Sequence, residues 1–170
     1  MWNYRGQQRP PFAVKPEPWQ ESVWDYPRPP KVIACNRLVE VTHKGILIAR
    51  ANQAYRVLET ASPPTFYIAQ HDIDWSRLAS MPRHSFCEWK GKASYYGLVD
   101  EPGAAPVAWQ YNDPLPAFEM IRGHVCFYPG RVACYVDGEP VRPQQSEFYG
   151  GWVTNEIVGP FKGDPGTGYW

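Results

Sequence analysis

The stretch Cys87-Glu88-Trp89-Lys90-Gly91-Lys92-Ala93-Ser94-Tyr95-Tyr96 carries the most structural information in this chain. The segments 85–90 and 92–99 predict two strands, and Gly91 between them predicts a turn. A thiol, a large aromatic ring and a cation stand together just before that glycine. This combination is unusual for a strand that only fills a core, so the stretch is also a candidate site.

Outside this hairpin, short apolar runs alternate with turn residues, as expected of a mostly β protein. The residues His43-Lys44-Gly45 predict a second hairpin, formed by strands 38–42 and 46–49. Long helices are excluded, because 14 glycines and 19 prolines interrupt the chain. The other expected elements are strands at 55–59, 65–69, 107–111, 124–128 and 132–137, and short helices at 74–80 and 116–121.

Composition indicates a folded chain with an aromatic core. The 8 Trp, 11 Tyr and 7 Phe replace much of the usual aliphatic mass, and each buries a large area. Because 17 basic residues balance 17 acidic ones and no basic stripe is present, a nucleic-acid partner is not expected.

Several features indicate a reduced, cytoplasmic protein. No apolar stretch is long enough to span a bilayer, so no membrane partner is expected. The first residues lack the apolar segment of a secretory signal. The four cysteines, at 35, 87, 126 and 134, are too few and too widely spaced for a disulfide scaffold.

The two ends differ from the middle of the chain. Residues 1–30 contain seven prolines and several aromatics, which predicts an extended arm that packs on a surface, with 21–30 docked. Residues 142–170 are rich in glycine and aromatics and predict a similar arm. We therefore expect a β domain at 31–141 between two arms, which could pack on their own domain or join a homodimer.

The body resembles the family known as domain of unknown function 427, which sometimes carries a nucleotidyltransferase-like label. The residues that carry the resemblance span about 37–141. They are Arg56-Val57-Leu58-Glu59-Thr60, Ser62-Pro63-Pro64 with Phe66-Tyr67, His71-Asp72-Ile73, the core Cys87-x-x-Lys90-Gly91-x-Ala93-x-Tyr95, Ala108-Trp109-Gln110-Tyr111 with Asp113-Pro114, and Ala133-Cys134-Tyr135-Val136-Asp137-Gly138.

The resemblance implies a β-tent-like fold, in which two antiparallel sheets lean together. Related tent folds often hold the apex with zinc bound by paired Cys-x-x-Cys motifs. This chain has no Cys-x-x-Cys, so aromatic packing is expected in place of zinc, and no cofactor is predicted. The resemblance implies no particular activity.

An aromatic ligand pocket is the leading functional hypothesis. Side chains alternate along a strand, so Trp109 and Tyr111 face the same way, and Trp89 and Tyr95 could join them across the Gly91 turn. Aromatic rings beside a cation suit a small planar or anionic ligand. The alternative is plain core packing. The predicted ligand-binding residues are Glu59, Trp89, Lys90, Tyr95, Trp109 and Tyr111.

An enzyme of small-molecule metabolism is a second hypothesis. Glu59 stands in an apolar strand and needs a partner, for which Lys90, Arg56 and Arg50 are candidates. A Glu59–Lys90 pair would be structural or would serve as a general acid and base. Cys87 is a candidate nucleophile, with His84 beside it. A third hypothesis is an interaction module that uses the arms.

Two metal arrangements are weaker possibilities. His84, Cys87, His124 and Cys126 could supply a tetrahedral zinc site, although their spacing matches no standard motif. Asp72 and Asp74 could hold magnesium for phosphoryl transfer, but no Gly-rich phosphate loop accompanies them. Asp74 fits better as a helix N-cap.

Overall fold

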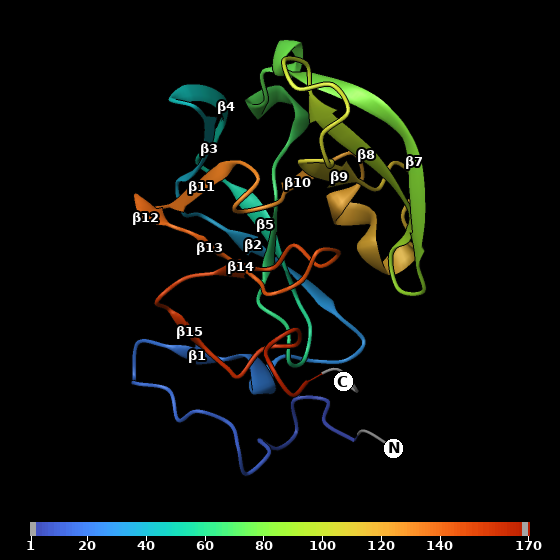
Figure 1. Cartoon of the computed structure of the whole chain (residues 1–170). Helices are drawn as coiled ribbons and strands as arrows, with labels where there is room; N and C mark the ends of the chain where they lie inside the picture. Colours follow the sequence, from blue (N-terminus) through green and yellow to red (C-terminus); the bar gives the residue numbers. More distant parts are fainter. Residues whose placement is uncertain (1–2, 168–169) are drawn as a thin grey trace.

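The structure is a computed structural model that describes residues 3–167 and 170 (Figure 1). It consists of strands and short 3-10 helices, which confirms the predicted mostly β class. The strands are β1 Glu21–Ser22, β2 Lys31–Cys35, β3 Val39–His43, β4 Ile46–Ala51, β5 Ala54–Leu58, β6 Thr65–Tyr67, β7 Leu78–Cys87, β8 Gly91–Leu98, β9 Ala108–Gln110, β10 Val125–Phe127, β11 Ala133–Val136, β12 Glu139–Pro140, β13 Arg142–Pro143, β14 Trp152–Val153 and β15 Ile157–Val158. The 3-10 helices are η1 Val23–Asp25, η2 Gln70–Asp72, η3 Trp75–Arg77 and η4 Pro116–Ile121.

Antiparallel sheets form the body. One has the order β12-β11-β3-β4 and lies on the left in Figure 1, and another, β10-β9-β8-β7, lies on the right. A third, β2-β5-β6, is joined to the β10 edge by an antiparallel bridge between Ile68 and Val125, with both N–H···O distances 2.8 Å. Because of this bridge, β2-β5-β6 and β10-β9-β8-β7 form one continuous run of strands, and the buried faces of all three sheets share one core.

The β3–β4 hairpin is formed at the predicted residues. His43 pairs with Ile46, so the loop consists of Lys44 and Gly45 alone. Both have positive φ, 51° and 77°, as a type I′ turn requires. This turn type matches the twist of the strands on either side, which explains why the local sequence was sufficient to predict it.

The expected helix at 74–80 is wrong beyond its first turn. The Asp74 Oδ1 accepts from the Ser76 N–H at 3.1 Å, the capping role that was predicted, but the helix is a single 3-10 turn. Leu78 then begins the ten-residue strand β7. Pro82 lies on β7, an edge strand, at the point where the register between β7 and β8 shifts. Proline lacks an N–H, and at this position its absence interrupts no pairing within the sheet.

Aromatic side chains fill much of the core, as expected from composition. Trp152 is fully buried, and its ring stacks on Phe66 with centroids 4.9 Å apart. Its Nε1 donates to the Phe127 carbonyl oxygen at 2.9 Å, so the buried indole N–H is satisfied. Trp152 therefore ties the C-terminal region to the centre of the domain.

The terminal segments pack on their own chain. Strand β1 pairs in parallel with β15, in the lower left of Figure 1. Trp24 in η1 is fully buried, and three rings meet its indole edge-on at centroid distances of 5.0–5.6 Å: Tyr4, Phe12 and Trp170. The predicted docking of 21–30 is thus observed within one chain. Within the described part of the chain, no helix is long and apolar enough to cross a membrane.

Candidate functional site

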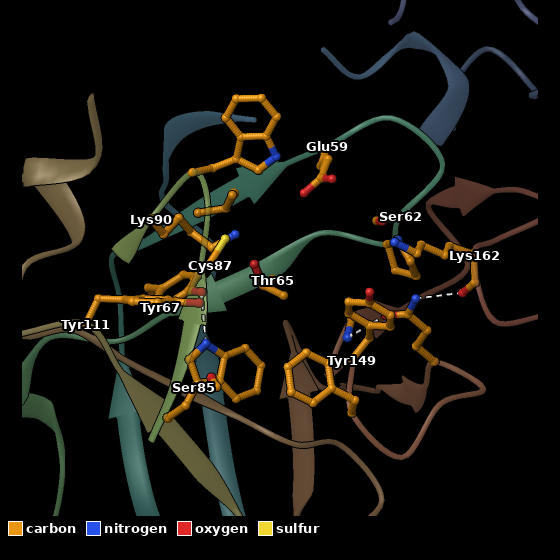
Figure 2. Close-up of a pocket in the computed structure, with 18 of the residues that line it drawn as sticks. Glu59, Ser62, Thr65, Tyr67, Ser85, Cys87, Lys90, Tyr111, Tyr149 and Lys162 are labelled. Carbon is orange, nitrogen blue, oxygen red and sulfur yellow. Dashed lines mark hydrogen bonds between the residues drawn. The ribbon is translucent and has the colours of Figure 1, made fainter. Parts of the chain in front are cut away.

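A cavity of about 270 Å³ opens between the β7–β8 turn, the β5–β6 connection and the C-terminal segment (Figure 2). Its size is close to the lower end of the range for small-molecule sites. We call it the aromatic cavity. Its lining aromatic residues are Tyr67, Phe86, Trp89, Tyr95, Trp109, Tyr111, Tyr128, Phe148 and Tyr149.

The structure brings all six residues of the predicted ligand set to the wall of this cavity. They come from four parts of the chain: the connection that follows β5, the β7–β8 turn, β8, and β9 with the residues after it. The set is Glu59, Trp89, Lys90, Tyr95, Trp109 and Tyr111. The alternation argument concerned Trp109 and Tyr111, with Trp89 and Tyr95 across the Gly91 turn, and these four side chains do line one cavity.

The floor of the cavity is a rigid aromatic group. The Trp109 Nε1 donates to the Tyr67 hydroxyl at 3.0 Å, and the Trp109 ring lies 4.6 Å from that of Tyr128. Burial raises the pKa of the Tyr67 and Tyr111 phenols, so both hydroxyls stay protonated at neutral pH. These phenols can therefore offer hydrogen bonds but not a catalytic phenolate.

The β7–β8 turn places the thiol and the ammonium group at the cavity. Cys87 pairs with Gly91, which leaves Glu88, Trp89 and Lys90 as the loop. Gly91 has φ +102°, and a Cβ there would lie 3.3 Å from the Asp113 carbonyl oxygen. Only glycine adopts this positive φ without strain and also leaves room for the Asp113 backbone, which explains why glycine stands at this position of the motif.

The expected ion pair of Glu59 is not formed. Strand β5 ends at Leu58, and Glu59 lies in the connection that follows, where it lines the cavity. Arg56 pairs instead with Glu21 at 2.6 Å, and Arg50 lies 3.9 Å from Glu40.

The Lys90 ammonium faces an aromatic ring instead of a carboxylate. Its Nζ lies 5.9 Å from the centre of the Tyr111 ring, in the range of a cation–π contact. Among the described residues, neither Glu59 nor Lys90 belongs to an ion pair. In this part of the chain, therefore, no ion partner neutralises either charge.

The His and Cys residues considered for zinc are not brought together. Cys87 lines the cavity but His84 is exposed and does not, so the two do not share a site. The His124 ring packs on Tyr55, with centroids 5.3 Å apart, while Cys126 is fully buried in the core. In residues 3–167 and 170, no group of three or more His, Cys, Asp or Glu could hold a metal ion.

The C-terminal wall of the cavity was missed in the sequence. It consists of Gln144, Phe148–Gly151 and Lys162, with Arg28 added from the N-terminal arm. Gly150 lies so near Trp109 that a Cβ would be 2.6 Å from two ring atoms. The run Phe148-Tyr149-Gly150-Gly151-Trp152 was the available signal, since paired glycines between aromatics permit such close packing.

Comparison with known proteins identifies a family. The model of a family described as "Domain of unknown function (DUF427)" matches residues 31–138, and no curated protein matches the chain. The matched span runs from β2 to the turn after β11 and contains the β7–β8 turn and the aromatic floor. It covers more than half of the chain. The protein therefore belongs to the DUF427 family.

Proposed function

We propose that the protein binds a small planar or anionic molecule in the aromatic cavity. The observation that carries this proposal is the convergence of nine aromatic side chains and Lys90 on one cavity. Aromatic walls with a few polar groups are the usual composition of small-molecule sites. Planar ligands gain stacking on the rings, and an anionic group gains from the unpaired ammonium.

The aromatic floor is held in place by contacts within the protein. The Trp109–Tyr67 hydrogen bond and the packing of Trp109 on Tyr128 hold the rings within the core. Such preorganisation reduces the entropy that ordering the site would cost on binding. At the mouth, Phe86 and Phe148 are 74% and 50% exposed, so apolar surface remains for a ligand to cover.

A thermal-shift screen of small aromatic compounds, with native mass spectrometry of the purified protein, tests the proposal. A compound that binds raises Tm in wild type, and this rise should fall in Lys90→Met and Tyr111→Phe. Lys92→Met is the matched control, because Lys92 is exposed on β8 and does not line the cavity. The proposal is wrong if no compound shifts Tm, or if the cavity variants respond as wild type does.

An enzymatic role is the second candidate, because Glu59, Cys87 and Lys90 surround the same cavity (Figure 2). A thiol, an ammonium and a carboxylate could together support covalent and acid–base chemistry on a bound molecule. Turnover of a bound compound should then be abolished by Cys87→Ser or Glu59→Gln with Tm unchanged. Full turnover in both variants would exclude this role.

A further inference from the structure

The C-terminal wall of the aromatic cavity lies outside the span that matches the family. Residues 31–138 supply the floor, the β7–β8 turn and Glu59, whereas Gln144, Tyr149 and Lys162 come from the chain beyond it. Any contact that a ligand makes with this wall would therefore be made with the C-terminal segment.

Lys162 is held firmly at its backbone. Its N–H donates to the Ala61 carbonyl oxygen at 2.7 Å, and its own carbonyl oxygen accepts from the Gln144 Nε2 at 2.6 Å. Gln144 is only 6% exposed, and its Oε1 accepts from the Gly151 N–H at 3.0 Å. One buried amide thus fixes two points of the wall.

The Lys162 side chain, in contrast, ends in an unpaired charge. Its Nζ lies 4.5 Å from the centre of the Tyr149 ring, and Tyr149 is 44% exposed. Lys162 makes no ion pair within the described ranges 3–167 and 170. In Figure 2, Lys162 and Lys90 stand on opposite sides of the cavity.

Charge around the cavity favours an anionic ligand. Three cations line it, Arg28, Lys90 and Lys162, against two carboxylates, Glu59 and Glu88, of which Glu88 is exposed. Lys90 and Lys162 are both half-buried residues. A partly desolvated ammonium gains more from an oxyanion than an ammonium in open water does, because fewer solvent molecules compete.

We propose that Lys162 binds the acidic group, a carboxylate or a phosphate, of a planar aromatic ligand whose ring lies on the Trp109–Tyr111 floor. This inference rests on the proposed function and narrows it, since the ligand must be both planar and anionic. The residue that selects for the charge is then supplied by the C-terminal segment and not by the span that matches the family.

Matched probes test the inference in the full-length protein. Benzoate and phenyl phosphate present the two acidic groups on one ring, and benzamide presents the same ring without charge. Binding is measured by titration calorimetry or ligand-observed NMR for wild type, Lys162→Met, Lys162→Arg and the control Lys92→Met. The ratio of anion to benzamide affinity is the readout, because a general loss of the cavity would lower both affinities together.

We expect wild type to favour at least one of the two anions over benzamide, and Lys162→Met to lower that preference by about tenfold or more. Lys162→Arg should retain much of the preference, and Lys92→Met should leave it unchanged. The stronger anion identifies the acidic group. Two results would overturn the inference and leave the proposed function intact. One is equal binding of benzamide and both anions to wild type, and the other is a preference for the anions that is unchanged in Lys162→Met. No binding of any of the three probes to wild type overturns both.

Discussion

The contact of Gly150 with Trp109 makes a sharp prediction for Gly150→Ala. A Cβ at this position would lie 2.6 Å from the Cη2 and Cζ3 atoms of Trp109 and 2.9 Å from the Cδ1 of Tyr128. Carbon atoms are at their optimal separation at about 3.5–4.0 Å, so the methyl group must displace the wall or the rings. Trp109 cannot move easily, because it is hydrogen-bonded to Tyr67 and is 8% exposed. Tyr128 is likewise only 6% exposed, and its hydroxyl donates to the Phe148 carbonyl oxygen at 3.0 Å.

Such overpacking costs about 1–3 kcal/mol in the free energy of unfolding. For a chain of this length the corresponding fall in Tm is roughly 2–12 °C. The assays are thermal and urea denaturation, in which the midpoint should fall while the slope with denaturant stays unchanged, since the unfolded surface is the same. Any ligand of the aromatic cavity should also bind Gly150→Ala more weakly.

Gly97→Ala is the matched control. Like Gly150, Gly97 is not in the left-handed region, but its Cβ would meet only the flexible Met81 side chain, at 3.3 Å. A change of less than about 1 kcal/mol is expected there. If Gly150→Ala were as stable as Gly97→Ala, the C-terminal segment would not lie on Trp109, and the wall that it forms would be refuted.

Three further predictions concern other parts of the molecule. Thiol labelling of the native protein, followed by mass spectrometry, should modify Cys87 first, because the other three cysteines are buried; simultaneous labelling of all four would contradict this packing. The Arg37 guanidinium lowers the pKa of Asp137 and of Glu156 below the usual values of 3.8 and 4.5. These ion pairs therefore stabilise the folded protein fully above the usual pKa values, and this stabilisation is lost as the pH falls through the lowered pKa values. Arg37→Gln should therefore lower the free energy of unfolding at neutral pH by at most about 1 kcal/mol per exposed pair. Urea denaturation across pH measures this, and the difference from wild type should shrink below about pH 4. A difference that does not change with pH would exclude these ion pairs as the cause. Trp152→Ala should cost about 3–5 kcal/mol in the free energy of unfolding, measured by urea denaturation, because it empties a fully buried site and removes the indole N–H that the Phe127 carbonyl oxygen accepts. A loss under about 1 kcal/mol would show that the C-terminal region is not part of the core.

Residues near one another in the chain accounted for the predictions that proved right. The β3–β4 hairpin follows from a two-residue turn, and the mostly β class from the frequency of glycine and proline. The alternation of side chains along a strand was enough to place Trp109 and Tyr111 on one surface.

Contacts between residues that are far apart in the chain decided the features that were not predicted correctly. The expected helix after Asp74 became an edge strand because β8 offers Leu78 a partner, and such pairing overrides a local preference. Within the described residues Glu59 forms no ion pair, and the arginine nearest to it in the sequence, Arg56, pairs with Glu21 of the N-terminal arm.

The sequence by itself thus determined the class of the fold, the aromatic core and six residues of the candidate site. Only the tertiary structure decided that the C-terminal segment closes the aromatic cavity and brings Lys162 to it. The physical reason is that Gly150 and Lys162 act through contacts with Trp109 and Ala61, residues far away in the chain. No periodicity or turn signal encodes such contacts, which depend on how the sheets and segments pack.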